Sequence, residues 1–416
     1  MQAPTIIDYL KKDIPDGVKE LLKIRQNTSK SSTAKYIKMI NSVNIDNRIR
    51  GTLQYCGASK TGRWAGRNIQ PQNFPRPEFK EKEIEKAIDL LKCGELKEDV
   101  PLYCSSMLRG AIISAKGKKL VVPDYASIEG RVLMWLAQEK EALKKYINFD
   151  KGIGFDAYVN TYADTFKINP KDVTKDQRQI GKPLSLAFGY QGGVGAFLTF
   201  AKSYNINVQK VASMVSLPPD IIEQAEWLYH KLKEWGKPAP LDIHTFTAID
   251  GMKRLWRNDH PHVVQYWKDV EEAAKNAILG YPSYVNNCYF DMKKRWLRIR
   301  LPSGRYLQYP NAKVIDDKIQ YWHYKYGVDH TYGGPLVENI TQAGARDILV
   351  FGIFEAEKYG YELVFTVHDE LVTEVPDTKE YSLQHLLTIL NLLPDWAYGL
   401  PLPADGFEGC RYKKED

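Results

Sequence analysis

Apolar residues in the N-terminal part of the chain recur at the three-to-four-residue spacing of helices. Between residues 18 and 40 this spacing predicts two helices, separated by a polar connector at 27–33. Another amphipathic helix is predicted over 80–91, after a stretch at 52–77 that is rich in Gly, Pro, Gln and Asn. Long irregular stretches of this kind are more typical of functional segments than of scaffold.

Two strand-like patterns end next to acidic residues. Residues 119–123 predict a strand that runs into Asp124 and is followed by a helix over 128–143. Residues 363–375 predict two strands on either side of a tight turn at His368-Asp369-Glu370, after a helix over 336–358. If these strands pair in one sheet, Asp124 and Asp369 come together.

The segment from 145 to 330 is predicted to be mostly helical. Breaks between its helices are expected at Pro170, at Pro218-Pro219, at 236–240 and at 280–282. Within it, residues 296–309 alternate basic and apolar side chains around Pro302-Ser303-Gly304, which predicts a hairpin.

The composition is that of a globular protein with more than one lobe. The 416 residues (47.7 kDa) are 44% hydrophobic, and at roughly 150 residues per domain they predict two or three lobes. No apolar run approaches the roughly 20 residues that span a bilayer, and no apolar stretch follows a basic patch at the N-terminus. Five scattered cysteines favour reduced thiols. We therefore expect a soluble, cytoplasmic protein.

Basic residues are concentrated in the first third. Residues 1–120 contain 23 Lys and Arg against 13 Asp and Glu, whereas the remaining 296 residues contain 35 against 38. The cations with few acids near them in sequence are Lys30, Lys35, Lys38, Arg48, Arg50, Lys60, Arg63, Arg67 and Arg76. Such a field favours nucleic acid, because phosphate contacts release counterions. The alternative is an ordinary solvated surface.

Three patterns carry candidate chemistry. Asp124 and Asp369 are carboxylates of the kind that Mg²⁺ binds, one or two at a time, together with substrate phosphates. Taken singly, Asp124 also suits a helix cap and Asp369 a turn. On a helix, Arg178, Lys182, Leu186 and Tyr190 would lie along one stripe, about 18 Å long. Two cations and an aromatic ring suit a nucleoside triphosphate, although such a stripe by itself is more often a solvated basic face.

In this order and spacing, the three patterns resemble the motifs of family A (DNA polymerase I-like) DNA polymerases, especially the phage-type members. The resemblance runs from about Thr28 to the C-terminus, and it includes 61–63 (Thr-Gly-Arg) and 72–75 (Gln-Asn-Phe-Pro). It implies an α+β right-hand polymerase fold, in which a palm with an antiparallel sheet carries helical fingers and a helical thumb. The implied boundaries are a partial thumb at 1–50, a palm at 51–144 and 331–416, and fingers at 145–330 that end with the hairpin.

The resemblance implies a template-directed DNA polymerase that adds dNTPs to a primer 3′ end by two-metal-ion nucleotidyl transfer. Asp124, Asp369 and the backbone carbonyl of Tyr125 match the ligands of two Mg²⁺ ions, for which Mn²⁺ is a substitute. Glu370 matches a secondary catalytic acid.

The residues implied to bind the incoming nucleotide come from two segments. Arg178 and Lys182 match the residues that grip the β- and γ-phosphates, with Lys182 also donating a proton to pyrophosphate. Tyr190 matches the aromatic that stacks at the template site, and Leu186 stands where many relatives have Phe or Tyr. Glu129 matches the steric gate against a ribose 2′-hydroxyl.

The residues implied to contact primer and template are Arg63, Gln72, Asn73, Gln342 and His368. For Arg298, Arg300 and Arg305 in the predicted hairpin, template phosphates and a solvated strand face are equally good interpretations.

Three features depart from the family pattern. Pro183 follows Lys182 and has no N–H to donate, so the finger helix either starts late or is kinked. Glu338 replaces the Asn of many relatives, one turn before Gln342. The exonuclease signature Asp-x-Glu occurs only at Asp269-Val-Glu271, inside a predicted helix. We therefore expect a polymerase that lacks a proofreading domain, either naturally or by truncation.

Two other functions stay open. A related RNA polymerase is disfavoured by Glu129, and a catalytically silent DNA-binding homologue is disfavoured by Asp124, Lys182 and Asp369. The expected partners are primer–template DNA and dNTPs. We expect a monomer that works in the cytoplasm of a phage-infected bacterium.

Overall fold

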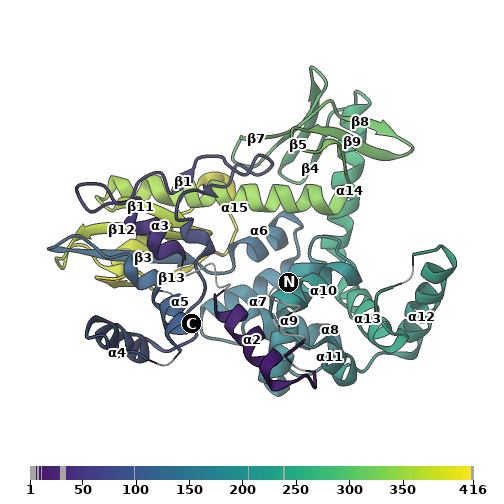
Figure 1. Cartoon of the computed structure of the whole chain (residues 1–416). Helices are drawn as coiled ribbons and strands as arrows, with labels where there is room; N and C mark the ends of the chain where they lie inside the picture. Colours follow the sequence, from purple (N-terminus) through teal and green to yellow (C-terminus); the bar gives the residue numbers. More distant parts are fainter. Residues whose placement is uncertain are drawn as a thin grey trace. The chain divides into compact units, whose positions relative to one another are not determined.

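The computed structural model describes residues 6, 9–10, 12–28, 34–97, 99–204, 206–237 and 239–413 (Figure 1). The chain divides into two compact units. The first consists of 1–126, 349–392 and 404–416, and the second of 127–348 and 393–403. The division into thumb, palm and fingers at the boundaries given above stays a prediction.

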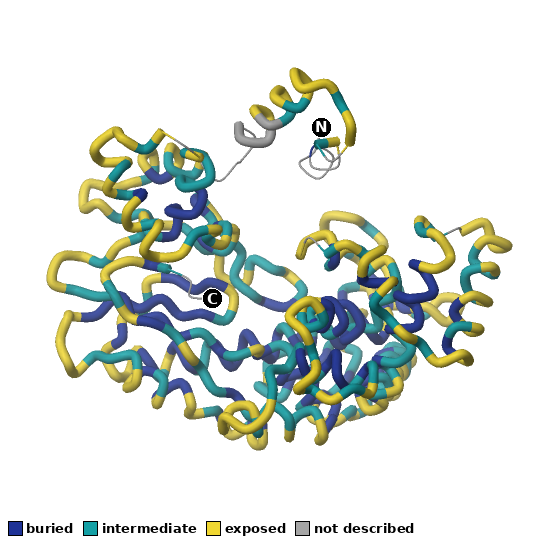
Figure 2. The backbone as a smooth tube through the Cα atoms, turned by 90° about the horizontal axis from the view of Figure 1, so that it is seen from below, coloured by how far each residue is buried: buried dark blue, intermediate teal, exposed yellow. Residues whose placement is uncertain are grey.

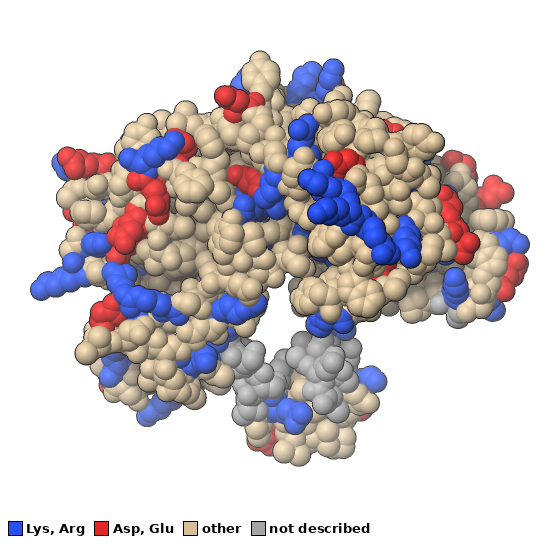
Figure 3. Space-filling view, turned by 90° about the horizontal axis from the view of Figure 1, so that it is seen from above, with Lys and Arg blue, Asp and Glu red and all other residues tan. Residues whose placement is uncertain are grey.

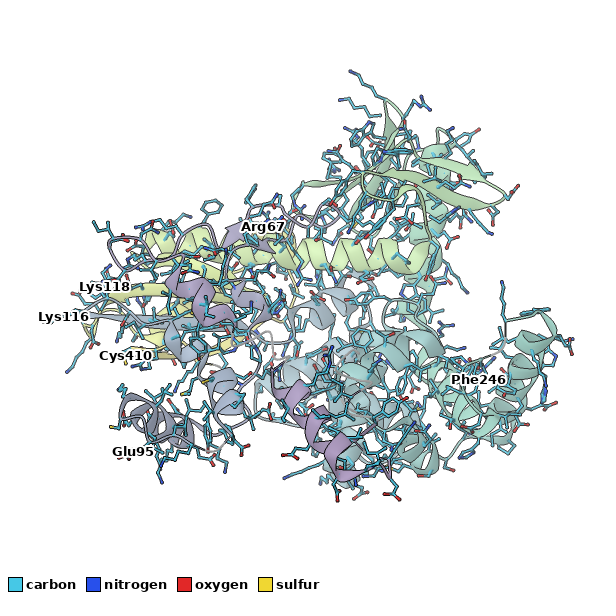
Figure 4. All side chains as sticks on the ribbon, viewed as in Figure 1. Arg67, Glu95, Lys116, Lys118, Phe246 and Cys410 are labelled. Carbon is cyan, nitrogen blue, oxygen red and sulfur yellow. The ribbon has the colours of Figure 1, made fainter. Side chains whose placement is uncertain are left out.

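A four-stranded antiparallel sheet lies at the centre of the first unit. Its strands are, in spatial order, β11 (Glu362–Val367), β12 (Glu370–Pro376), β3 (Lys118–Tyr125) and β13 (Ala404–Gly409). Successive strand residues point to opposite faces, so Asp124 lies on the same face as the buried Leu120 and Val122. At the other end of these strands, Lys118 begins β3 and Cys410 directly follows β13 (Figure 4).

Helices and irregular segments make up the rest of the first unit. They include α2 (Asp16–Thr28), α3 (Ala34–Ile40), β1 (Leu53–Gln54), β2 (Ala65–Gly66), η1 (Pro71–Asn73), α4 (Glu81–Lys92), α5 (Val100–Met107), η2 (Arg109–Ala111) and α16 (Leu383–Leu390). The helices predicted within 18–40 and over 80–91 are confirmed. The stretch at 52–77 is irregular as predicted, apart from the short β1, β2 and η1.

The second unit begins with helices. They are α6 (Ile128–Leu136), α7 (Lys140–Asp150), α8 (Ala157–Phe166), α9 (Lys175–Phe188), α10 (Val194–Ser203), α11 (Val208–Met214), α12 (Pro219–Glu234), α13 (Ile243–Asp259) and α14 (Pro261–Ile278). The single helix predicted over 128–143 is wrong, because Gln138 adopts a left-handed φ of 59° between α6 and α7. The next residue, Glu139, is buried and accepts the N–H groups of His262 (3.1 Å) and Val263 (3.3 Å) in the first turn of α14.

Two antiparallel sheets follow α14. The first is formed by β4 (Ser283–Val285), β5 (Cys288–Lys293), β6 (Trp296–Arg300) and β7 (Tyr306–Pro310), and the second by β8 (Lys313–Ile315), β9 (Lys318–His323) and β10 (Gly327–Thr331). The predicted hairpin is confirmed as β6–β7, but the prediction of mostly helical structure is wrong for 283–331. Asp316 and Asp317, both with left-handed φ, form a tight turn that was not predicted.

The helix predicted over 336–358 is confirmed as α15 (Gly333–Lys358). Its first part belongs to the second unit and its last part to the first. Its buried residues include Leu336, Val337, Ile340 and Ile348, and Figure 2 shows buried stretches within the elements of each unit. Among the described helices, none combines the length and the apolar character that crossing a membrane requires.

Candidate active site

The turn that contains Asp369 lies beside the end of β3. Glu370 pairs with Asp124 in antiparallel register, and the N–H of Tyr125 donates to the carbonyl of Asp369 at 3.2 Å. His368 closes the turn with a left-handed φ of 56°, a conformation that is uncommon for residues other than glycine. The predicted pairing of the two acid-bearing strands is therefore confirmed.

Three carboxylates form a row across the sheet at this point. Asp124 on β3 lies opposite Glu370 on β12 and opposite Asp405 on β13. Residues directly opposite each other in an antiparallel sheet share a face, with Cβ atoms about 5 Å apart. In the described part of the chain, no three His, Cys, Asp or Glu side chains are grouped closely enough to enclose a metal ion by themselves. A cation at Asp124 would need further ligands from water or substrate, as Mg²⁺ commonly takes.

A buried chain of hydrogen bonds leads away from this row. The hydroxyl of Tyr412 donates to Oε1 of Glu370 at 2.5 Å, and Nη1 of Arg109 donates to the same hydroxyl at 2.7 Å. Burial, and after it the Glu370 carboxylate, raises the pKa of Tyr412, so the hydroxyl remains a donor. Arg109 also donates to the carbonyls of Phe74 (3.0 Å) and Pro75 (3.2 Å). One oxygen of Glu370 is thus engaged inside the protein.

The predicted primer–template residues of the first third lie on the irregular segment. Gln72 contacts the sheet, since its Nε2 donates to the carbonyl of Thr366 at 3.4 Å. Its Oε1 is buried and has no hydrogen-bond partner among the described residues. Asn73 is exposed and donates to Oε1 of Gln70 at 2.8 Å, while Arg63 is half-buried.

Several cations of the first third are less available than the sequence suggested. Arg48 pairs with the buried Glu374 at 2.6 Å, and Arg50 pairs with Asp46 at the same distance. Nζ of Lys35 donates to the carbonyl of Ile69 at 2.7 Å. Arg67, labelled in Figure 4, bonds Gln54 across the β1–β2 pair. Lys30 lies outside the described residues.

In the second unit, α9 carries the predicted phosphate-binding cations. A capping box starts the helix, with Thr174 and Gln177 exchanging hydrogen bonds of 3.3 and 2.8 Å. Gly181 allows close packing on α8, because a Cβ there would lie 2.2 Å from the carbonyl oxygen of Tyr158. Arg178 and Lys182 both lie over the ring of Tyr158, each 5.6 Å from its centroid.

Arg178 is also oriented by Asp156, the residue that precedes α8. Its Nε donates to Oδ2 of Asp156 at 2.9 Å, while Oδ1 of Asp156 caps α8 by accepting the N–H of Tyr158 at 2.9 Å. Lys182 lies 5.6 Å from the ring centroid of a second tyrosine, Tyr204. The two cations are thus held side by side on aromatic surface.

Two predictions about this helix need correction. Pro183 occupies the ninth position of α9, so the alternative in which the helix starts late is wrong, and the carbonyl of Gln179 has no N–H four residues on. The helix ends at Phe188, which places Leu186 on it and Tyr190 in the turn that follows. The four-residue stripe therefore holds for Arg178, Lys182 and Leu186 but does not extend to Tyr190.

The turn with Tyr190 is fixed against the start of α15. The N–H of Gly334 donates to Oε1 of Gln191 at 2.8 Å. A Cβ on Gly334 would lie 2.5 Å from the carbonyl oxygen of Tyr190, so only glycine allows this approach. Further along the same helix, Nε2 of Gln342 donates to Oε1 of Glu338 at 3.2 Å. Glu338, which replaces the Asn of many relatives, thus orients the side chain of Gln342.

Glu129 and Arg305 have different surroundings. Glu129 lies in the first turn of α6 and is half-buried. Arg305 donates to Oδ1 of the buried Asp347 at 2.7 Å and to the carbonyl of Ala343 at 3.1 Å. Arg305 therefore ties the β6–β7 connection to α15, so the interpretation as part of a solvated strand face is wrong for it, while its contact with template phosphates stays a prediction.

Comparison with known proteins identifies the family of the chain. Residues 4–216 match the sequence model of DNA polymerase family A. The chain belongs to this family. The resemblance noted in the sequence is thereby confirmed.

Two relatives of this family A chain show how much of a polymerase it spans. It is 34% identical over 420 aligned positions to the DNA polymerase of Bacillus phage SP02, which takes in 96% of this chain and 58% of that protein. It is 21% identical to DNA polymerase I of Borreliella burgdorferi, over 93% of this chain and 32% of that protein. The family A chain thus spans less than two thirds of the length of either relative.

The fold of the family A chain is similar to that of a solved polymerase domain. The structure is the POL domain of Pol1 from M. smegmatis in complex with DNA primer-template and dNTP, with a TM-score of 0.61 and 16% identity, over 99% of this chain and 56% of that one. The expected α+β right-hand polymerase fold is confirmed.

Four residues that contact the carboxylate row or the α9 cations were not predicted from the sequence of the family A chain. Asp156 and Tyr158, which orient the α9 cations, precede α9 by about twenty residues, and no local spacing relates them to it. Asp405 lies in β13 and Tyr412 just beyond it, and this strand was not predicted. Only the pairing of β13 with β3 reveals that Asp405 neighbours Asp124.

Proposed function

We propose that the family A chain extends a DNA primer along a template, adding deoxynucleotides to the primer 3′ end with two divalent cations. The observation that carries this proposal is the pairing of β3 with β12, which sets Asp124 beside the Asp369 turn. Two relatives that are DNA polymerases, and the primer–template and dNTP in the similar structure, support it.

The oxygen donors at the strand ends fit Mg²⁺. Asp124 and Asp369 would hold the ions, with the backbone carbonyl of Tyr125 as a further ligand. When bound, the two ions supply a lowered pKa for the primer 3′-hydroxyl and positive charge at the triphosphate. Glu370, with one oxygen engaged by Tyr412, would fix the turn rather than coordinate an ion. Mn²⁺, which also accepts carboxylates, is expected to substitute.

The α9 cations suit the triphosphate. Phosphoryl transfer depends mainly on positioning and positive charge, and Arg178 and Lys182 offer two cations one helical turn apart. Lys182 would donate a proton to the pyrophosphate leaving group. Tyr190 would stack at the template position, and Glu129 would exclude a ribose 2′-hydroxyl by occupying its space.

Primer and template contacts are assigned to five residues of the two units. Arg63, Asn73 and His368 are exposed or half-buried in the first unit, and Gln342 is oriented by Glu338 in the second. Gln72, which contacts β11, would support the residues of the first unit. Minor-groove acceptors lie at similar places in every correct pair, so such contacts test the shape of the pair.

We also propose that these 416 residues do not edit mismatched ends. Asp269 and Glu271 lie on α14, where Glu271 accepts the N–H of Gly333 at 3.0 Å and pairs with Lys275 at 2.9 Å. Asp269 accepts the side-chain amide of Gln265 on the same helix. Glu271 thus joins α14 to the start of α15, while Asp269 bonds within α14, and both engagements support the proposal that this pair does not form an exonuclease site. Because one relative is a phage DNA polymerase, we propose that the chain acts in the cytoplasm of an infected bacterium.

Template-directed incorporation tests the proposal. Four primer–templates that differ only in the first templating base are each offered one dNTP at a time with Mg²⁺. We expect extension only with the complementary dNTP. On a primer with a mismatched 3′ end, we expect neither efficient extension nor removal of the mismatched nucleotide. Addition that ignores the template, or the absence of addition with every dNTP, would refute the proposal.

A further inference from the structure

The β4–β7 sheet of the second unit has two different faces. One face carries Phe290, Leu297, Ile299, Leu307 and Tyr309, all at most 2% exposed. This face belongs to the core beside α14, whose residues lie close to β4, β5 and β6. The opposite face, called the open face below, has Tyr284 exposed and Tyr289, Arg300 and Tyr306 half-buried, and its residues have no role in the proposed chemistry.

A row of aromatic and cationic side chains crosses the open face. Tyr284 on β4 lies opposite Tyr289 on β5, Tyr289 lies opposite Arg300 on β6, and Arg300 lies opposite Tyr306 on β7. The rings of Tyr284 and Tyr289 are 4.7 Å apart. The Arg300 guanidinium lies 5.4 Å from the ring centroid of Tyr289, and its Nη2 donates to the Tyr284 hydroxyl at 3.0 Å.

The neighbouring row continues this pattern. Arg298 lies 4.7 Å from the ring centroid of Tyr306, and Asp291, opposite it on β5, accepts hydrogen bonds from both Nε and Nη2 of its guanidinium. The exposed Trp296 follows, opposite Lys293. Lys294 and Arg295 form the exposed turn between β5 and β6.

The charge on this sheet is strongly positive. Residues 283–310 contain six Lys and Arg and a single acidic residue, Asp291, whereas 313–331 in the adjoining sheet contain three Lys and three Asp. Figure 3, which is seen from the side on which these sheets lie in Figure 1, shows Lys and Arg side chains gathered in a band. Aromatic rings interleaved with cations are the surface that single-stranded nucleic acid binds, because every base offers a π-face.

We propose that the open face of β4–β7 binds the single-stranded template ahead of the primer terminus. Tyr284, Tyr289 and Tyr306 would stack with bases, while Arg300 and the Lys293–Arg295 turn would contact phosphates. Four strands at about 4.8 Å spacing extend over roughly 14 Å, enough for two or three bases. The identity of the strand rests on the proposed function, but the binding itself does not.

Equilibrium binding of labelled primer–templates, without dNTPs, tests the proposal. Wild-type protein is compared on DNA that is blunt or has a six-nucleotide 5′ template overhang. We expect the overhang to tighten binding. Tyr289→Ala and Tyr306→Ala should each weaken binding of the overhanging DNA about tenfold, while affinity for blunt DNA stays unchanged. Tyr289→Phe should retain the gain, since the ring remains.

Matched controls separate the possible outcomes. Trp322 on β9 and Tyr324 in the turn after it are exposed aromatics (50% and 77% exposed), and changing either to Ala should leave the overhang effect intact. The proposal is overturned if the β4–β7 variants lose affinity for blunt and overhanging DNA equally. Failure of nucleotide addition would overturn the proposed function while leaving this comparison of binding intact.

Discussion

The hydroxyl of Tyr412 donates a 2.5 Å hydrogen bond to Oε1 of Glu370, the residue paired with Asp124 across β12 and β3. Arg109 links the same hydroxyl to the carbonyls of Phe74 and Pro75. A continuous buried network therefore joins the segment after Gln72 and Asn73 to the strand ends that carry the acids. We infer that Tyr412 is a positioning residue for the Asp369 turn.

Tyr412→Phe is expected to lower the rate of nucleotide addition about tenfold and to raise the Mg²⁺ concentration needed for half-maximal rate, as loss of a supporting bond at a metal site commonly does. Tyr361→Phe is the matched control. Tyr361 is also fully buried in the first unit, and its hydroxyl bonds the carbonyl of Ser382 at 3.0 Å. Equal effects of the two variants on the Mg²⁺ requirement would show that the Tyr412 bond is merely structural.

Tyr158→Ala is expected to raise the KM for dNTP about fivefold with a smaller change in kcat, because it removes the ring beneath Arg178 and Lys182. Tyr158→Phe keeps the ring and should restore the wild-type KM. Steady-state kinetics of single-nucleotide addition measure both constants. An unchanged KM for Tyr158→Ala, in a variant that melts like wild type, would separate the ring from nucleotide binding.

Glu129→Ala is expected to raise incorporation of ribonucleotides at least about tenfold relative to deoxynucleotides, because it opens space for the 2′-hydroxyl. The ratio of kcat/KM for dNTP and rNTP is the measurement. Glu141→Ala, in the first turn of α7, is the control and should leave that ratio unchanged. If sugar selectivity is the same in Glu129→Ala as in wild type, Glu129 is not the gate.

Glu374 makes the first unit sensitive to acid. Its side chain is 3% exposed and pairs with Arg48 at 2.6 Å and Lys118 at 3.4 Å. Burial alone would raise the pKa of Glu374, but the Ala115 N–H, Arg48 and Lys118 together hold it below its ordinary value of 4.5. A carboxyl with a lowered folded pKa contributes stability above its unfolded pKa, and this contribution is lost as the pH falls.

Glu374→Gln should therefore lower the free energy of unfolding by about 1–2 kcal/mol at pH 7, and by less at pH 3. Urea unfolding of both proteins at the two pH values measures the difference. Glu362→Gln is the control, because Glu362 is 71% exposed where it pairs with Lys118, and an exposed pair contributes little. A deficit of Glu374→Gln that is the same at both pH values would contradict the ionic explanation.

Local sequence patterns predicted many of the helices and strands and most of the candidate site residues. Strand-like runs beside Asp124 and Asp369, together with the α9 spacing, were enough to locate the acids and cations. Contacts between segments distant in sequence were not predictable, because Tyr412 reaches Glu370 only through the sheet and Asp156 reaches Arg178 only through the packing of α8 on α9. Short strands such as β8 and β10 were missed because three to five residues carry little periodicity.

The most direct test of the central claim is the single-turnover rate of nucleotide addition by Asp124→Asn and Asp369→Asn in saturating Mg²⁺. Asp377→Asn is the control, since Asp377 is exposed just past the other end of β12. We predict that each of the first two variants loses about a thousandfold in rate, because several kcal/mol of charge stabilisation disappears with the ligand, while the control keeps the wild-type rate. Wild-type rates in Asp124→Asn or Asp369→Asn would contradict the assignment of these two carboxylates as the catalytic centre.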